Sequence, residues 1–319
     1  MNFKGLDLNL LIALDALLDL RHVSRAADKL HVTQPAMSAS LAKLRQHFDD
    51  GLLVPIGRQM HLTPLAQELG AHVRSILTQV EGLLQSRPVF DAHSAQSVFR
   101  VMASDYGLTV VVSELLRRLK GIAPRVGVEV VPFSDSPSKS LAEGHVDFLL
   151  ITRDYLAPRH PTLALFEDSF VCVAWRDNPE LGETLTLQQF QELGHVAVKY
   201  GYAGVPHLSE RFFLANRITR RVEVTVNGFN SVPHLVVGTR RIGMMHARLA
   251  AIYARQMPLK LYVPPTPVPT VHQSMQWHSL RENDRACHWF REQIVQTALQ
   301  IRATAPLGEG VAAGRRIAC

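Results

Sequence analysis

Polar side chains follow a helix-capping threonine at residues 33–45, in an arrangement suited to contacts with bases. Thr33 is a good N-cap, and Pro35 falls in the first helical turn, where its missing N–H costs nothing. The apolar positions at helical spacing, expected to face inward, are Ala36, Met37, Leu41 and Leu44. The remaining side chains can form hydrogen bonds, and they are Gln34, Ser38, Ser40, Lys43 and Arg45.

A second short helix precedes this one and completes a recognisable pair. Ser24 can cap a helix over 25–30, and a turn follows at His31 and Val32. A short helix, a tight turn and a second helix with a polar face form a helix-turn-helix, whose second helix enters the major groove of DNA. Gln34 is suited to a bidentate pair with adenine, and Ser38 to a single bond with a base or phosphate. The alternative is a merely solvated helix face.

Residues 52–62 are consistent with a two-stranded wing, because Gly57 and Arg58 lie between two strand-like runs. Arg58 would then lie along a phosphate backbone or in a minor groove.

A second group of candidate residues lies at strand ends in the C-terminal half. Residues 98–103 read as a strand that leads into a helix capped by Ser104, with Asp105 beside it. In open α/β sheets a ligand binds outside the carboxyl ends of strands, and free N–H groups at a helix start favour an electronegative ligand atom. The other candidates at strand ends or loops are Phe133, Lys199, Tyr200, Phe229 and His246. The alternatives are that Ser104 is only a cap, that Phe133 and Phe229 are core, and that Lys199 is solvated.

Composition excludes several classes of protein. The chain has 319 residues, 47% hydrophobic and 19% charged, which suits two or three globular domains. No apolar run is long enough to span a membrane, and Asp7, Asp15 and Asp19 argue against a signal peptide, so we expect a cytoplasmic protein with no membrane partner. The three cysteines lie far apart and are predicted to be buried thiols. The histidines are scattered without the spacing of metal ligands, so we expect no metal site and no cofactor. The net charge of +6 suits a polyanionic partner, but residues 1–64 hold seven Lys/Arg against six Asp/Glu.

Two further helices and a long α/β region must position these residues. A first helix is predicted over 6–20, from Leu10, Leu11, Leu14, Leu17 and Leu18. A long helix over 64–84 is predicted to dimerise, because its apolar positions step by four and three; they are Leu69, Val73, Ile76, Val80 and Leu83. The alternative is that this stripe packs on its own domain.

Beyond residue 87 strands and helices alternate, which predicts a mostly parallel α/β fold. Strands are expected at 98–103, 126–133, 148–152, 170–175, 195–200, 222–226, 242–246 and 271–277, and helices at 108–119, 208–216 and 283–302.

Residues 7–65 closely resemble the LysR-type transcriptional regulators, through DLNLLIALDALL, SRAADKLHVTQPAMSASLAKLRQHFDD and a wing ending in LTP. One branch of this family is most similar in three later strings, which are ASDYG, EGHVDFLLI and QWHSLRENDRACHWFREQI. This branch holds the nodulation activators and the naphthalene and salicylate regulators, whose members respond to flavonoids or small aromatic acids. The resemblance implies a winged helix-turn-helix over 1–64, a linker helix over 65–90 and a periplasmic-binding-protein-like effector domain over 91–302. Subdomain I is expected at 91–165 and 265–302, subdomain II at 166–264, and a disordered tail at 303–319.

The same resemblance implies that Gln34, Pro35 and Ser38 face DNA and that Lys43 lies near its backbone; we add Ser24, Arg25, Thr33 and Arg58 to the DNA-binding set. It also implies a homodimer or homotetramer on promoter DNA and a small, aromatic effector. The sequence departs from the family pattern at three positions. Ala39 stands where the family often has a basic residue, Arg45 where it often has an acidic one, and Pro55 where an arginine often follows the first strand of the wing.

Three alternatives stay open. An enzyme is disfavoured because no nucleophile elbow, P-loop or dinucleotide fingerprint is present. A solute-binding protein is disfavoured by the helix-turn-helix and the lack of a signal peptide. An effector-independent repressor or global regulator of the same fold cannot be separated by sequence.

Overall fold

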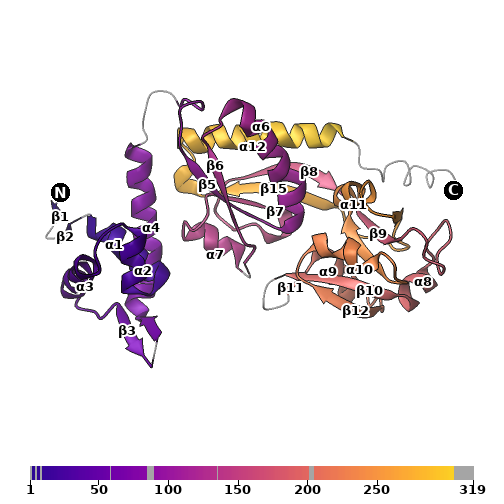
Figure 1. Cartoon of the computed structure of the whole chain (residues 1–319), viewed down its shortest axis with the longest axis horizontal. Helices are drawn as coiled ribbons and strands as arrows, with labels where there is room; N and C mark the ends of the chain where they lie inside the picture. Colours follow the sequence, from indigo (N-terminus) through magenta and orange to yellow (C-terminus); the bar gives the residue numbers. More distant parts are fainter. Residues whose placement is uncertain are drawn as a thin grey trace. The chain divides into compact units, whose positions relative to one another are not determined.

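The computed structural model describes residues 2–3, 6–7, 9–57, 59–84, 90–134, 136–200 and 205–304. The chain forms two compact units, one made of residues 1–88 with 142–145 and the other of 89–141 with 146–319 (Figure 1). Each unit has its own hydrophobic core.

The N-terminal unit is built from four helices and a hairpin. They are α1 (Asn9–Leu20), α2 (Val23–Lys29), α3 (Gln34–Phe48), the antiparallel β3 (Leu53–Ile56) and β4 (Gln59–Leu62), and α4 (Pro64–Leu84); a two-residue pair, β1 (Asn2–Phe3) and β2 (Leu6–Asp7), precedes them. The predicted stripe of the first helix is confirmed at its centre, since Leu11, Leu14, Leu17 and Leu18 are buried. In α3 Met37, Leu41 and Leu44 are buried as expected, whereas Ala36 is exposed because it lies in the first turn, beyond the core.

The C-terminal unit holds two mixed sheets, so the expectation of a mostly parallel fold is only partly met. The first sheet has the order β6 (Gly127–Val131), β5 (Val98–Ala103), β7 (Phe148–Thr152), β15 (Val271–Trp277), β8 (Thr162–Asp168). Strand β5 is parallel to β6 and β7, but β15 runs antiparallel to β7 and β8. The antiparallel β15 comes from the chain's return after the second sheet, which sequence patterns alone do not orient.

Helices cover both faces of this first sheet, because successive side chains along a strand point to opposite faces. Phe148 and Leu150 of β7 face a core shared with α6 (Ser113–Ile122) and α12 (Arg285–Ala303), while Leu149 and Ile151 face α7 (Pro137–Ala142). Figure 1 shows α6 and α12 together on one side of the sheet and α7 on the other.

The second sheet has the order β11 (Val205–Pro206), β10 (Gly194–Tyr200), β13 (Ile242–His246), β9 (Phe170–Trp175), β14 (Leu259–Tyr262), with β12 (Arg221–Val226) beside β10. Its helices are α8 (Leu187–Glu192), α9 (Leu208–Ala215), α10 (Val232–Val236) and α11 (Ala247–Ala254). The chain changes sheets between Asp168 and Phe170 rather than at residue 166, because the unpredicted strand β8 still belongs to the first sheet. Strand β14 and helices α7, α8, α10 and α11 were also not predicted, because they are short and carry weak periodicity.

Candidate functional site

The helix-turn-helix forms as the sequence predicts at its second helix. The Thr33 hydroxyl accepts a hydrogen bond from the Ala36 N–H at 3.4 Å, and Pro35 lies in the first turn of α3. Gln34, Ser38 and Lys43 are exposed, outside the buried stripe. These side chains are therefore available to a macromolecular partner.

The first helix of this pair begins earlier than predicted. Helix α2 starts at Val23, and its cap is His22, whose Nδ1 accepts a hydrogen bond from the Arg25 N–H at 3.4 Å. Ser24 is half-buried within the first turn and does not cap the helix, while Arg25 is exposed. The imidazole nitrogen takes the role expected of the serine hydroxyl because the chain enters the helix two residues sooner.

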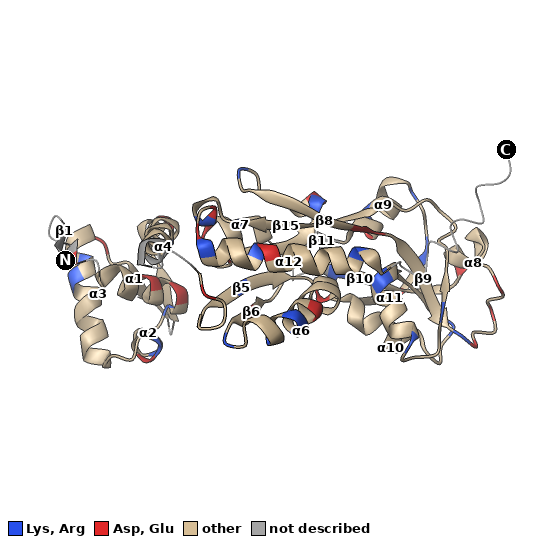
Figure 2. Ribbon diagram, turned by 90° about the horizontal axis from the view of Figure 1, so that it is seen from above, with Lys and Arg blue, Asp and Glu red and all other residues tan. Residues whose placement is uncertain are grey.

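Arg45 braces the wing against α3. Its Nε donates to the Gly51 carbonyl at 2.8 Å and its guanidinium donates to the Leu53 carbonyl at 2.5 Å. The wing turns at Gly57, whose φ of +63° suits glycine. Arg58, predicted to contact phosphates, lies outside the described residues. Figure 2 shows both basic and acidic positions along α2.

The long helix α4 divides its apolar stripe between two environments. Val73 is buried, and Leu69 and Leu77 pack against the core of the N-terminal unit. By contrast Ile76 is 42% exposed and Val80 is 39% exposed. The side chain of Leu83 is outside the described residues. Part of the predicted dimer seam thus belongs to the core of the N-terminal unit, and the rest is exposed to solvent.

Ser104 is a helix cap and also a wall of a pocket. Its hydroxyl accepts a hydrogen bond from the Gly107 N–H at 3.3 Å, at the start of α5 (Asp105–Gly107), which continues through the π-helical η1 (Leu108–Val112) into α6. The pocket, which we call the Ser104 pocket, is lined by Ser104, Tyr106, Phe133, Ile151, Thr152, Tyr155, His207, His246 and Gln273. Its walls come from both sheets of the C-terminal unit.

Buried polar groups of the Ser104 pocket lack hydrogen-bond partners in the described part of the chain. They are Thr152 Oγ1, Gln273 Nε2 and both ring nitrogens of His246. Thr152 and Gln273 sit opposite each other on β7 and β15. All three residues are at most 7% exposed. An unpaired buried polar group costs about 1–3 kcal/mol, so such a group is poised to bond a ligand.

Aromatic rings surround the His246 imidazole. Tyr106 stacks on it with ring centroids 3.8 Å apart, and Phe229 meets it edge-on at 4.5 Å. Burial lowers the pKa of His246 well below its usual range, and the neighbouring His207 acts in the same direction. Burial also lowers the pKa of His207, to about 3. Both rings are therefore neutral near pH 7 and can offer one donor and one acceptor each.

Three other predicted effector residues are placed differently. Asp105 points to the second subdomain, where its Oδ2 accepts a hydrogen bond from the Asn230 N–H at 2.6 Å; burial raises its pKa. Phe229 is buried core behind His246, and Lys199 is exposed on β10. The side chain of Tyr200 lies outside the described residues. The structure therefore brings together Ser104, Phe133 and His246 from the predicted set.

Sequence reasoning missed six lining residues, which are Tyr106, Ile151, Thr152, Tyr155, His207 and Gln273. Thr152 ends a predicted strand, so the rule that ligands bind at carboxyl strand ends could have found it. No local pattern marks Gln273, because it lies near the start of an antiparallel strand whose orientation was not predicted.

Two family matches cover most of the chain. Residues 8–67 match the bacterial regulatory helix-turn-helix proteins of the lysR family, and residues 92–299 match the LysR substrate binding domain. The chain belongs to the LysR family. It is thus a LysR-type, DNA-binding transcriptional regulator, and its relatives are regulators rather than enzymes.

Curated relatives of this LysR-type regulator include nodulation proteins. It is 41% identical over 298 residues to nodulation protein D 1 of Bradyrhizobium sp. (strain NC92), covering 93% of this chain and 95% of the relative. Nodulation protein D 1 of Mesorhizobium japonicum is 39% identical over 306 residues, covering 96% of this chain and 97% of the relative.

Two solved structures from Pseudomonas aeruginosa share the fold. A probable transcriptional regulator from Pseudomonas aeruginosa superimposes with a TM-score of 0.66 at 29% identity, covering 91% of this chain and 97% of that one. A full-length OxyR variant from the same organism gives 0.73 at 16% identity, covering 93% and 95%. Among the described residues no helix combines the length and apolar character needed to cross a membrane.

Proposed function

We propose that this LysR-type regulator binds promoter DNA through α3 and the wing, and senses a small aromatic compound in the Ser104 pocket. The observation that carries the effector half is the set of buried, unpartnered polar groups on Thr152, Gln273 and His246, next to aromatic rings. A ligand with a ring and one or two oxygens would satisfy these groups and pack against Tyr106 and Phe133. The resemblance to the branch with nodulation activators favours the same class.

The effector must rearrange the pocket to enter it. The pocket has about 10 Å³ of free volume, which is about the space of one water, whereas a cavity of roughly 150 Å³ holds benzene. Tyr155 belongs to the short helix η2 (Arg153–Tyr155) of the first subdomain, and the Arg211 guanidinium of α9 lies 5.9 Å from its ring centre. Opening between these two side chains would enlarge the pocket, so the effector would bind a more open state.

The DNA-binding half rests on the exposed face of α3. Gln34 and Ser38 would contact base edges, and Thr33, Pro35 and Lys43 would fix the helix against the backbone, with Ser24, Arg25 and Arg58 adding contacts nearby. A homodimer, or a tetramer made of two dimers, would place two recognition helices in successive major grooves. The exposed Ile76 and Val80 of α4 offer an apolar contact for such a dimer.

Calorimetry with hydroxylated benzoates, phenols and flavonoids tests the effector site. We expect one class to bind the wild type, and Ser104→Ala and Thr152→Val each to weaken binding about fivefold or more, since a hydrogen bond contributes about 1 kcal/mol. Thr225→Val, at an exposed position on β12, is the matched control and should bind as the wild type does. Binding equal in all four proteins would remove the Ser104 pocket as the site. No binding by any compound would favour the effector-independent regulator.

A further inference from the structure

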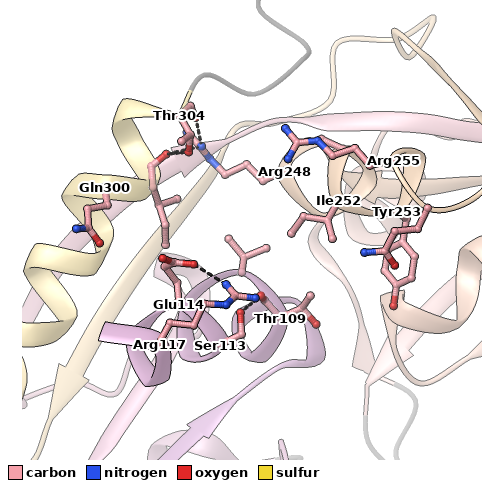
Figure 3. A pocket seen from close by; sticks show the side chains of 14 residues that line it. Thr109, Ser113, Glu114, Arg117, Arg248, Ile252, Tyr253, Arg255, Gln300 and Thr304 are labelled. Atoms are coloured by element: carbon pink, nitrogen blue, oxygen red, sulfur yellow. Dashed lines mark hydrogen bonds and ion pairs between the residues drawn. The ribbon is translucent and has the colours of Figure 1, made fainter. Parts of the chain in front are cut away.

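A second, larger cavity lies between helices of the two subdomains of the C-terminal unit. It has a volume of about 660 Å³, within the range of small-molecule sites, and none of its lining residues belongs to the Ser104 pocket. We call it the helix pocket. Its walls include Thr109, Ser113 and Arg117 from the helix run of the first subdomain, and Arg248, Ile252 and Arg255 from α11 and its C-cap (Figure 3).

Helical spacing explains why these side chains face each other. Thr109, Ser113 and Arg117 recur every four residues, which keeps them on one helix face. Arg248, Ile252 and Arg255 recur at four and three on the opposing helix. The C-terminal end of α12, with Gln300 and Thr304, closes a third side.

The pocket carries an excess of positive charge. Arg117 pairs with Glu114 at 2.5 Å, so that charge is neutralised. Arg248 donates to the Ile301 and Thr304 carbonyls, at 2.6 Å each, but its Nε is buried and has no partner in the described part of the chain. Arg255 is exposed and forms no ion pair or side-chain hydrogen bond within the described ranges. Arg255 thus retains its donors for an anion, and Arg248 adds positive charge to the same wall.

Apolar side chains share the same walls as these arginines. Val110 and Ala251 are buried, and Ile252 and Tyr253 are half-buried beside them. A hydrated inorganic ion would gain nothing from such a surface, whereas an organic acid would bury its hydrocarbon part there. We propose that the helix pocket is a second binding site, for a small organic carboxylate that pairs with Arg255 and packs on Ile252 and Tyr253.

A short chain of hydrogen bonds connects the walls of the two pockets. Thr109 of the helix pocket accepts a hydrogen bond from the Asn230 side chain at 3.0 Å, and the Asn230 N–H donates to Asp105, the residue after Ser104. The walls of the helix pocket come from both subdomains, so a carboxylate bound between them would favour one spacing between the subdomains. It then changes the affinity of the Ser104 pocket, and the change is reciprocal.

The test uses the full chain with benzoate and 4-bromobenzoate as probes. We expect calorimetry to show benzoate binding that Arg255→Gln weakens at least tenfold and that Thr152→Val leaves intact. The matched control is Arg240→Gln, which alters an exposed arginine paired with Glu180 away from the pocket. In crystals soaked with 4-bromobenzoate, the anomalous signal of bromine should lie in the helix pocket, beside Ile252.

Two results would overturn the second site. One is a bromine signal confined to the Ser104 pocket, with benzoate binding lost in Thr152→Val and kept in Arg255→Gln, which would support the proposed effector site alone. The other is no benzoate binding and no bromine signal in the helix pocket, whatever the outcome of the aromatic panel at the Ser104 pocket.

Discussion

The Tyr106 hydroxyl donates a hydrogen bond of 2.8 Å to the buried Asp168 carboxylate. Tyr106 lies in the first turn of the helix run that follows Ser104, and Asp168 is the last residue of β8, just before the chain crosses to the second sheet. Burial raises the pKa of Asp168, and the Tyr106 hydrogen bond opposes this. The Tyr106 ring also stacks on His246. The Tyr106 side chain therefore connects the point where the chain passes between the two sheets to the Ser104 pocket.

Replacing Tyr106 with Phe should destabilise the effector domain while keeping the ring stack. The Asp168 carboxylate would lose a buried hydrogen bond, at a cost of about 1–3 kcal/mol. Thermal unfolding followed by near-UV circular dichroism would measure it. Tyr262→Phe, which removes a longer bond of 3.2 Å to the Gly182 carbonyl, is the comparison and should cost less. An unchanged midpoint in Tyr106→Phe would show that the bond contributes nothing.

Replacing Gln34 with Ala should weaken specific DNA binding by roughly 1–3 kcal/mol and leave non-specific affinity nearly unchanged. Gln34 is exposed at the start of α3, where a recognition helix contacts bases. Gln46→Ala, at an exposed position near the other end of the same helix, is the control. The measurement is a footprint titration on the operator and on unrelated DNA. A wild-type footprint in Gln34→Ala would contradict the assignment.

Placing Lys at both Ile76 and Val80 should dissociate the dimer proposed above. These side chains are 42% and 39% exposed, so the change should spare the core of the N-terminal unit, but it would bury charge in an apolar contact between chains. Sedimentation velocity reports the assembly state, and Gln79→Lys controls for added charge on the same helix. Should the double variant remain associated and bind operator normally, the contact lies elsewhere.

The effector domain should lose stability as the pH falls from about 6.5 towards 4, and His195 should account for part of that loss. Burial lowers the pKa of His195 to about 4; its Nε2 bonds the Phe190 carbonyl at 2.6 Å, and Arg220 donates to its Nδ1 at 3.2 Å. In the unfolded chain its pKa is about 6.5, so between these pH values only the unfolded state binds the proton. The free energy of unfolding then falls by about 1.4 kcal/mol per pH unit for this residue.

Denaturant titrations of wild type and His195→Gln between pH 7 and 4 would measure this slope. The variant should have the shallower dependence, by about one proton. Glu210, whose pKa is raised by burial, acts in the opposite sense at the acidic end and is present in both proteins. Parallel curves would show that His195 does not titrate as described.

Local sequence patterns determined many of the helices and strands of this protein. The Thr33 cap, the inward Met37, Leu41 and Leu44, and the strand before Ser104 depend on interactions within one turn or one strand, so spacing and residue type determine them. The family match rests on the same local strings, and the order of domains follows from it.

Tertiary structure decided what local pattern could not. The stripe of α4 reads as one seam, yet packing against α1 takes Val73 inward and leaves Ile76 open. The Ser104 pocket joins Thr152, His207 and Gln273, which lie far apart in the chain. Thr152 and Gln273 meet because β15 returns antiparallel beside β7, and His207 comes from the second subdomain. Such contacts depend on how distant segments fold together, and a single sequence has no local signal for the pairing of remote strands.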